Sequence, residues 1–254
     1  MQETQEITEV WRQSAVAGIS PKRLVLVTDF DGTLAEVVPD PAMSAARPDS
    51  LDALRELAAL LSEVIVLSSR KPVEIEALVP IPGVRLIGDS GLGMPAHAQK
   101  EALDGFNAEA ARLLQGVHGS WIEVKPASTT VHFRHTGLTG EEMLALLGAA
   151  LDGSPLEMSL GRKVVEIHVP GGKGSALAAL LPSLDAGGVV CFGDDENDRS
   201  LFEYVSSLDL PHMCVGAWSA EAPRDLFDRC DLVVPGPSGA VEVLQEIVRW
   251  ARGF

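Results

Sequence analysis

The sequence predicts an α/β fold in which a parallel-sheet core is interrupted by an inserted α/β unit. Two observations support this prediction. Short apolar runs alternate with segments of helical periodicity after residue 20, which indicates buried parallel strands joined by crossover helices. Between about residues 95 and 169 the strands become alternately polar and apolar, which is typical of antiparallel strands in a sheet with one open face.

The first part of the predicted core covers residues 1–96. Its strands are expected at 24–28, 64–68 and 84–88, and the first two are runs of apolar residues. Helices are expected at 48–62 and 72–79. Leucines in the first of these helices recur at intervals of three and four residues, and Pro48 lies in its first turn.

The inserted unit is predicted at residues 97–169. It contains a helix at 101–117, strands at 121–125 and 129–135, a second helix at 141–151, and strands at 156–159 and 163–169 that turn at Gly161. The core then resumes at residues 170–254, with helices expected at 174–181, 196–205 and 240–251 and with strands at 189–192, 213–215 and 232–234.

Composition excludes several classes of function. The net charge of −16 opposes general binding of nucleic acids and of anionic lipid surfaces. No apolar run reaches the roughly twenty residues of a membrane span, and no signal peptide is visible. Three cysteines lack metal-ligand spacing, and Cys191 and Cys214 lie in strand-like runs, which indicates buried free thiols. We therefore expect a cytoplasmic, monomeric protein that acts on a small molecule.

Polar residues follow strand ends or begin helices at four points of the core. Carboxyl ends of parallel strands meet at one edge of a sheet, where ligands bind. Together the four loops provide a carboxylate nucleophile, a hydroxyl donor, a cation and acids for a metal, which is a set suited to phosphoryl transfer. The loops are Asp29-Phe-Asp-Gly-Thr-Leu34, Ser68-Ser-Arg70, Gly171-Gly-Lys-Gly-Ser175 and Gly193-Asp-Asp-Glu-Asn-Asp198.

Two of the loops also have a simpler interpretation. Asp29 and Asp31 could belong to a calcium loop, but such loops need a later bidentate glutamate at fixed spacing, which is missing. The acidic run at 194–198 could be a solvated turn, although it follows a buried strand directly. The order of the four loops favours the catalytic interpretation.

The four loops resemble, in order, the motifs of the haloacid dehalogenase (HAD) superfamily of phosphatases. Within that superfamily the sequence is most similar to the trehalose-6-phosphate phosphatases. The resemblance implies a Rossmann-like core with a cap inserted between the second and third motifs. The residues that carry it are Leu67-Ser-Ser-Arg70, Glu123-Val-Lys125, His132-Phe-Arg134, Val165-Glu-Ile167, Lys173-Gly174 and Gly193-Asp-Asp-Glu-Asn-Asp198 followed by Phe202.

The resemblance implies a role for each catalytic residue. Asp29 would attack phosphorus and form an aspartyl-phosphate. Asp31 would protonate the leaving sugar oxygen and then activate water. Ser68 would donate a hydrogen bond to the phosphoryl oxygens, and Lys173 would neutralise their charge.

The same resemblance implies a Mg²⁺ ion. Its ligands would be Asp29, the backbone carbonyl of Asp31 and Asp194. Asp198 is assigned to the metal set, with the alternative that it orients Lys173 or a metal-bound water. Asp195 and Asn197 are candidates for the shell around these ligands.

Substrate contacts are expected from both parts of the chain. In the cap, Glu123 and Lys125 would share one strand face, as would His132 and Arg134, and closure of the cap would exclude water. The residues assigned to the substrate by resemblance are Gly32, Thr33, Arg70, Glu123, Lys125, Arg134 and Glu166.

These observations predict a Mg²⁺-dependent phosphatase of a sugar phosphate, with trehalose 6-phosphate as the expected substrate. The chain departs from the family pattern at Ser90 and Gly93, where the family has a histidine and an acid. Phosphates of other disaccharides, pseudo-disaccharides such as validoxylamine, or monosaccharides therefore stay open as substrates. The alternatives from other classes are a phosphomutase and a silent sugar-phosphate-binding protein.

Overall fold

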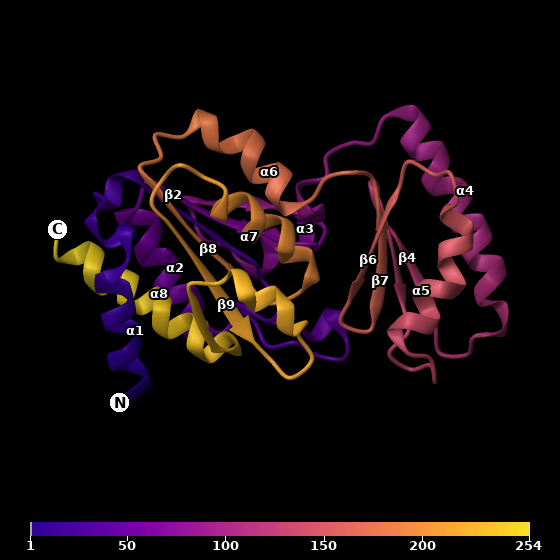
Figure 1. The fold of residues 1–254 in the computed structure, drawn as a ribbon, viewed down its shortest axis with the longest axis horizontal. Helices are drawn as coiled ribbons and strands as arrows, with labels where there is room; N and C mark the ends of the chain where they lie inside the picture. Colours follow the sequence, from indigo (N-terminus) through magenta and orange to yellow (C-terminus); the bar gives the residue numbers. More distant parts are fainter. Residues whose placement is uncertain (1) are drawn as a thin grey trace. The chain divides into compact units, whose positions relative to one another are not determined.

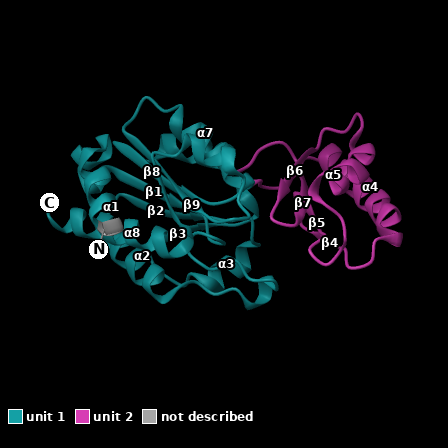
Figure 2. Cartoon of the chain, turned by 60° about the horizontal axis from the view of Figure 1, so that its bottom comes forward, with its two compact units in different colours: residues 1–91, 173–254 teal, residues 92–172 magenta. Residues whose placement is uncertain are grey.

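A computed structural model describes residues 2–254 and divides the chain into two compact units. The core unit comprises residues 1–91 and 173–254, and the cap unit comprises residues 92–172 (Figure 2). The cap predicted from the sequence, 97–169, lies inside the observed cap unit. No helix within the described residues is long and apolar enough to cross a membrane.

The core unit is built on a six-stranded sheet (Figure 1), and its strand order is β10-β9-β8-β1-β2-β3. Every neighbouring pair in it is parallel. The two central strands, β1 and β8, are buried along their whole length, as their apolar sequences predict. The strands are β1 Leu24–Thr28, β2 Glu63–Leu67, β3 Val84–Ile87, β8 Gly188–Gly193, β9 His212–Trp218 and β10 Leu232–Pro235.

Helices cover both faces of the core sheet. Alternate residues of β1 enter two different apolar clusters: Leu26 packs on the side of α2, α3 and α8, and Val27 packs on the side of α6 and α7. Figure 2 shows α7 on the opposite side of the sheet from α2 and α3. The core helices are α1 Gln2–Gln13, α2 Pro48–Leu60, α3 Pro72–Leu78, α6 Lys173–Leu180, α7 Arg199–Ser206 and α8 Gly236–Arg252.

The cap unit is a four-stranded antiparallel sheet with two helices on one face. Its strand order is β4-β5-β7-β6 (Figure 2). Val131 and Ile167 point to the helices and belong to the cap core. Because successive side chains of a strand point to opposite faces, their neighbours Thr130 and Glu166 face the open side. The elements are α4 His97–Leu113, β4 Trp121–Val124, β5 Ser128–His132, α5 Gly140–Gly148, β6 Glu157–Gly161 and β7 Val164–His168.

Short 3₁₀ segments complete several connections. Helical patterns that the sequence predicts as continuous are divided here: the segment at 196–205 consists of a 3₁₀ turn followed by α7. The 3₁₀ segments include η1 Ala15–Gly18, η4 Asp89–Gly91, η5 Leu114–Gly116, η6 Ala149–Leu151 and η8 Glu196–Asp198.

The structure differs from the sequence predictions at several places, including helix α4, which covers residues 97–113 where 101–117 was predicted. Helix α1 was not expected, because only Ile7, Val10 and Trp11 mark its apolar face in an otherwise polar segment. The β6–β7 turn lies at residues 162 and 163, not at Gly161, and Lys163 there takes a positive φ of 57°. Strands β4 and β5 end earlier than predicted, so the alternation does not extend to residues 125 and 134.

The predicted buried thiols are observed. Cys191 and Cys214 lie opposite each other on β8 and β9, and both are buried free cysteines with their sulfur atoms 3.4 Å apart. They fill the interior of the sheet as small apolar side chains.

Removal of the Trp11 side chain is expected to destabilise the core unit. Trp11 is 1% exposed, and its ring packs edge-on against Trp250 at a centroid distance of 5.2 Å. Trp11→Ala should lower the free energy of unfolding by about 3–5 kcal/mol, measured by urea denaturation followed by circular dichroism. Trp218→Ala is the control, because Trp218 is 44% exposed. A loss below about 1 kcal/mol in Trp11→Ala would contradict the prediction.

Candidate active site

Asp29 directly follows β1 at the carboxyl edge of the core sheet and is almost fully buried. Its carboxylate Oδ1 lies 2.6 Å from Nζ of Lys173, whose side chain is completely inaccessible to solvent. The same Nζ donates a hydrogen bond of 2.7 Å to Oδ1 of Asp198. The lysine ammonium is therefore held between two buried carboxylates, one from the end of β1 and one from the loop after β8.

The position of Lys173 depends on close packing of two helices. Lys173 begins α6, directly after Gly171 and Gly172, which have φ values of 137° and 144°. A Cβ at Gly174 would lie 2.1 Å from the carbonyl oxygen of Ser200 in α7. Only glycine permits this approach, which brings the start of α6 to the loop that carries Asp198.

The pKa values of Asp29 and Lys173 are both raised, but for different reasons. Burial raises the pKa of Asp29 to about 7, against the opposing effect of Lys173 and with a further rise from Asp198. Burial alone would lower the pKa of Lys173, but Asp198 and Asp29 overcome that effect and raise it. Lys173 is therefore a permanent cation, whereas Asp29 titrates near neutral pH.

The carboxylates of Asp29, Asp194 and Asp198 each bring one oxygen within 4.8 Å of the others, and all three residues are buried. Gly32, with φ of +79°, lies beneath this group, and a Cβ there would be 1.9 Å from Oδ2 of Asp194. Three carboxylates in a space that excludes a side chain fit a hard divalent cation, which prefers oxygen ligands.

Asp198 has protein partners for both of its oxygens. Oδ1 accepts the hydrogen bond from Lys173, and Oδ2 accepts hydrogen bonds from the backbone N–H groups of Asp194 and Asp195 at 2.9 and 3.2 Å. These contacts fit the alternative that the sequence left open, in which Asp198 orients Lys173. They also fold the acidic loop into the 3₁₀ turn η8.

The side chain of Asp31 is held by Arg70. The guanidinium donates two hydrogen bonds, Nε to Oδ2 at 2.7 Å and Nη2 to Oδ1 at 2.8 Å, and Ser44 donates to Oδ1 at 3.0 Å. A bidentate pair of this kind fixes the orientation of a carboxylate. The structure thus assigns Arg70 a partner that the sequence did not predict, and it adds Ser44, for which the sequence gave no signal.

Two hydroxyl residues of the predicted site are buried in the core unit. Ser68 is 1% exposed, and its Oγ accepts a hydrogen bond of 3.2 Å from the backbone N–H of Arg70. Thr33 is fully buried, and its hydroxyl finds no hydrogen-bond partner in the part of the chain that the structure describes. A buried hydroxyl without a partner is unfavourable by about 1–3 kcal/mol, so Thr33 is suited to meeting a bound anion.

The cap residues predicted to bind sugar separate into two groups. Glu123 and Glu166 lie on either side of Thr130 on the open face of the cap sheet, in register across β4, β5 and β7. Lys125 and Arg134 lie beyond opposite ends of the β4–β5 pair, and Nη2 of Arg134 donates to the carbonyl of Arg162 at 3.5 Å.

The structure adds Trp121 and Thr130 to the open face of the cap. The rings of Trp121 and His132 stack at a centroid distance of 3.5 Å and an angle of 5°. Nε2 of His132 lies 3.4 Å from Oε2 of Glu123, so the aromatic pair fixes one side of that carboxylate. Trp121 precedes Glu123 by two residues and could have been found from the strand period alone, whereas Thr130 depends on the cross-strand register.

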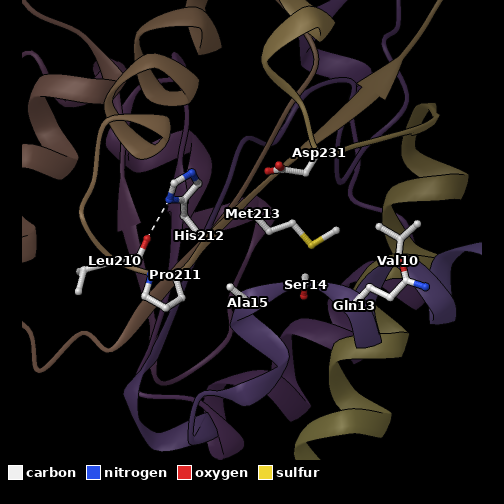
Figure 3. Close-up of a pocket in the computed structure, with 9 residues that line it drawn as sticks. All are labelled: Val10, Gln13, Ser14, Ala15, Leu210, Pro211, His212, Met213 and Asp231. Carbon is white, nitrogen blue, oxygen red and sulfur yellow. Dashed lines mark hydrogen bonds between the residues drawn. The ribbon is translucent and has the colours of Figure 1, made fainter.

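A cavity of about 470 Å³ lies elsewhere in the core unit, between the end of α1 and the start of β9. Figure 3 shows His212, Met213 and Asp231 along its wall. His212 begins β9 and Asp231 precedes β10, so this cavity is at the amino edge of the sheet, opposite to Asp29. The cavity is therefore separate from the candidate active site.

Comparison with known proteins agrees with this geometry. The model of the trehalose-phosphatase family matches residues 27–224. A bifunctional trehalose-6-phosphate synthase/phosphatase from Thermoproteus tenax is 33% identical over 201 residues, which cover 72% of this chain and 27% of that protein. A trehalose-phosphate phosphatase from Mycobacterium tuberculosis is 29% identical over 213 residues, which cover 76% of this chain and 54% of that protein. The chain therefore spans between about a quarter and half of the length of these relatives.

Solved structures share the fold over almost the whole chain. The C-terminal domain of trehalose-6-phosphate phosphatase from C. albicans superposes with a TM-score of 0.74 at 17% identity, covering 97% of this chain and 96% of that one. The sucrose-phosphatase from Synechocystis superposes with a TM-score of 0.57 at 16% identity, covering 90% and 98%. The expected HAD core with a cap is therefore confirmed as the fold.

Binding of a divalent cation is expected to depend on pH because the cation and a proton compete for Asp29. With its pKa raised to about 7, this carboxyl holds a proton below that pH and must release it to bind metal. The association constant for Mn²⁺, measured calorimetrically, should rise about tenfold per pH unit below pH 7 and level off above it. Asp29→Asn should bind more weakly and without this slope. An equally flat profile for the unaltered protein would contradict the prediction.

Proposed function

Because the chain belongs to the trehalose-phosphatase family, we propose that it hydrolyses the phosphate monoester of a disaccharide, with trehalose 6-phosphate as substrate. The observation that carries the proposal is the buried contact of 2.6 Å between the Asp29 carboxylate and the Lys173 ammonium at the carboxyl edge of the sheet. A nucleophile and a cation held together in a water-excluded place are what transfer of a dianionic phosphoryl group requires.

In the first step an oxygen of Asp29 attacks phosphorus while the bond from phosphorus to the sugar oxygen breaks. Asp31 gives its proton to the departing sugar oxygen, so trehalose leaves as a neutral alcohol. Lys173 offsets the negative charge on the phosphoryl oxygens, and the hydroxyls of Ser68 and Thr33 donate hydrogen bonds to them. The product of this step is an acyl phosphate on Asp29.

In the second step water attacks the phosphorus of the acyl phosphate and the bond to Asp29 breaks. Asp31, now a carboxylate, accepts the proton of the attacking water and returns to its starting state. Arg70 holds Asp31 as a carboxylate through two hydrogen bonds, at 2.7 and 2.8 Å, and so orients it as the proton acceptor of this second step. Inorganic phosphate is released.

We further infer that Asp29 and Asp194, with the backbone carbonyl of Asp31, hold a Mg²⁺ ion. When bound, Mg²⁺ supplies positive charge that removes the repulsion between a carboxylate nucleophile and a phosphate dianion. Asp198 contributes by fixing Lys173 and the acidic loop, since both of its oxygens have protein partners.

The open face of the cap is proposed to bind the sugar. Glu123 and Glu166 offer carboxylate oxygens to sugar hydroxyls, with Thr130 between them in register. Lys125 and Arg134 add donors at the two ends of the β4–β5 pair. An array of acceptors and donors this wide suits a sugar larger than one ring, which favours a disaccharide phosphatase over a phosphomutase of monosaccharides.

The substrate is tested by measuring phosphate release from a panel of mono- and disaccharide phosphates in the presence of Mg²⁺. The proposal expects trehalose 6-phosphate to give the highest kcat/KM. A clear preference for glucose 6-phosphate, sucrose 6-phosphate or a pseudo-disaccharide phosphate would support the phosphatase activity but contradict trehalose 6-phosphate as the substrate. Exchange of phosphate between sugar isomers would identify a mutase, and binding without turnover would identify a sensor.

Asp29→Asn is expected to abolish turnover, because an amide cannot form the acyl phosphate. The kcat should fall by at least about a thousandfold, with no labelled phosphoenzyme after acid quenching. Asp185→Asn is the control, because Asp185 is a surface residue with 81% of its side chain exposed and should keep kcat within about twofold. Turnover by Asp29→Asn at the rate of the unaltered protein would remove Asp29 as the nucleophile.

Trp121→Ala is expected to weaken sugar binding without affecting chemistry at phosphorus. Loss of the stacked ring frees His132, and through it the carboxylate of Glu123. The KM for trehalose 6-phosphate should rise about tenfold, and kcat/KM for p-nitrophenyl phosphate, which has no sugar, should stay constant. Val124→Ala is the matched control, because Val124 is 56% exposed on the other face of the same strand. Equal effects on both substrates would contradict the role of the cap face.

A further inference from the structure

Three consecutive residues that follow β3 adopt left-handed backbone conformations. Asp89, Ser90 and Gly91 have φ values of 50°, 53° and 70°. Residues other than glycine avoid this region because Cβ approaches the following carbonyl, so two of them in succession store strain. Such strain persists only where surrounding contacts fix the chain, and it concentrates at functional sites. We call residues 88–91 the β3 turn.

The β3 turn is bonded to the loop that carries Ser68 and Arg70. The N–H of Ser90 donates to the carbonyl of Ser68 at 2.8 Å, and the N–H of Asp89 donates to the carbonyl of Arg70 at 2.7 Å. A Cβ at Gly88 would lie 2.7 Å from the Arg70 carbonyl oxygen, so the two backbones are in direct contact. The left-handed conformation is what aims two successive N–H groups at this loop.

The other side of the β3 turn contacts α6. A Cβ at Gly91 would lie only 2.3 Å from Cβ of Ala176, and Ala176 is three residues after Lys173 on the same helix. The bare backbone of Gly91 therefore sets how closely α6 approaches. Ser90 between these contacts is 6% exposed, and its hydroxyl has no hydrogen-bond partner among residues 2–254. The Ser90 side chain adds no hydrogen bond among these residues, so the contact that fixes Ser90 is that of its backbone N–H.

We propose that the β3 turn is a positioning element that holds the Ser68–Arg70 loop and the start of α6 at a fixed separation. The inference rests on the proposed function, in which Ser68 and Lys173 must reach the same phosphoryl group. The two residues come from different elements, and the β3 turn contacts both elements, one at Ser68 and the other at Ala176. Gly91 is the positioning residue, because a side chain there moves α6 and hence the ammonium of Lys173.

The experiment compares Gly91→Ala with Gly93→Ala. Gly93 also has a left-handed conformation, with φ of +52°, but nothing lies within 4 Å of a Cβ built there. Both substitutions place an alanine at a positive φ, and only the first adds a collision with Ala176. Gly91→Ala should lower kcat for trehalose 6-phosphate at least about tenfold with KM changed less than about twofold, and Gly93→Ala should leave both within about twofold.

A double variant separates positioning from loss of stability. Gly91→Ala combined with Ala176→Gly removes the colliding methyl group and should recover most of kcat, while the strain at residue 91 and the lowered Tm stay. Ala176→Gly alone should leave kcat within about twofold. If Gly91→Ala does not fold, Ala176→Val adds bulk from the helix side without altering the turn, and it should lower kcat in the same way.

The inference is overturned if folded Gly91→Ala, or Ala176→Val in its place, keeps kcat, or if the double variant fails to recover it. Circular dichroism and Tm establish that each variant is folded before its kinetics are compared. A parallel assay with p-nitrophenyl phosphate tests the positioning element independently of which sugar phosphate is the substrate. An unaltered protein that hydrolyses p-nitrophenyl phosphate but not trehalose 6-phosphate would refute the substrate, while the effect of Gly91→Ala on kcat would still test the positioning element.

Discussion

The buried ion cluster formed by Lys173 with Asp29 and Asp198 is the constraint on which the rest of the core depends. Each isolated charge would lose several kcal/mol of solvation on burial, and the ammonium here is fully enclosed. The cluster is tolerated because every charge has a partner at 2.6 or 2.7 Å. The end of β1, the start of α6 and the loop after β8 must therefore meet at this point, and removal of Lys173 would leave two buried carboxylates without their counter-charge.

Close backbone contacts make that meeting possible. The space beneath Asp194 exists because Gly32 has no side chain, α6 reaches α7 because Gly174 has none, and α6 reaches the β3 turn because Gly91 has none. Each contact removes the layer of side chains that normally separates elements by several ångströms. Glycine loses more conformational entropy on folding than other residues, and here the loss is offset by the placement of charged groups.

The two units use their sheets differently, and the difference follows from their hydrogen-bonding geometry. A parallel sheet with helices on both faces leaves only its edges for ligands, so charged groups of the core gather where β1 and β8 end. An antiparallel sheet with helices on one face has a whole face for polar side chains. The cap carries Glu123, Thr130 and Glu166 on that face, in register across three strands.

The sequence by itself determined the fold class, the order of the elements and the four loops of the site, because buried strands and catalytic loops leave local patterns. It did not reveal α1, because the helix has few apolar residues and is stabilised by a contact between Trp11 and the distant Trp250. Nor did it reveal the pairing of Asp31 with Arg70, the full engagement of Asp198, or the stack of Trp121 on His132. Only the tertiary structure decided these, because each depends on side-chain positions that no local sequence pattern specifies.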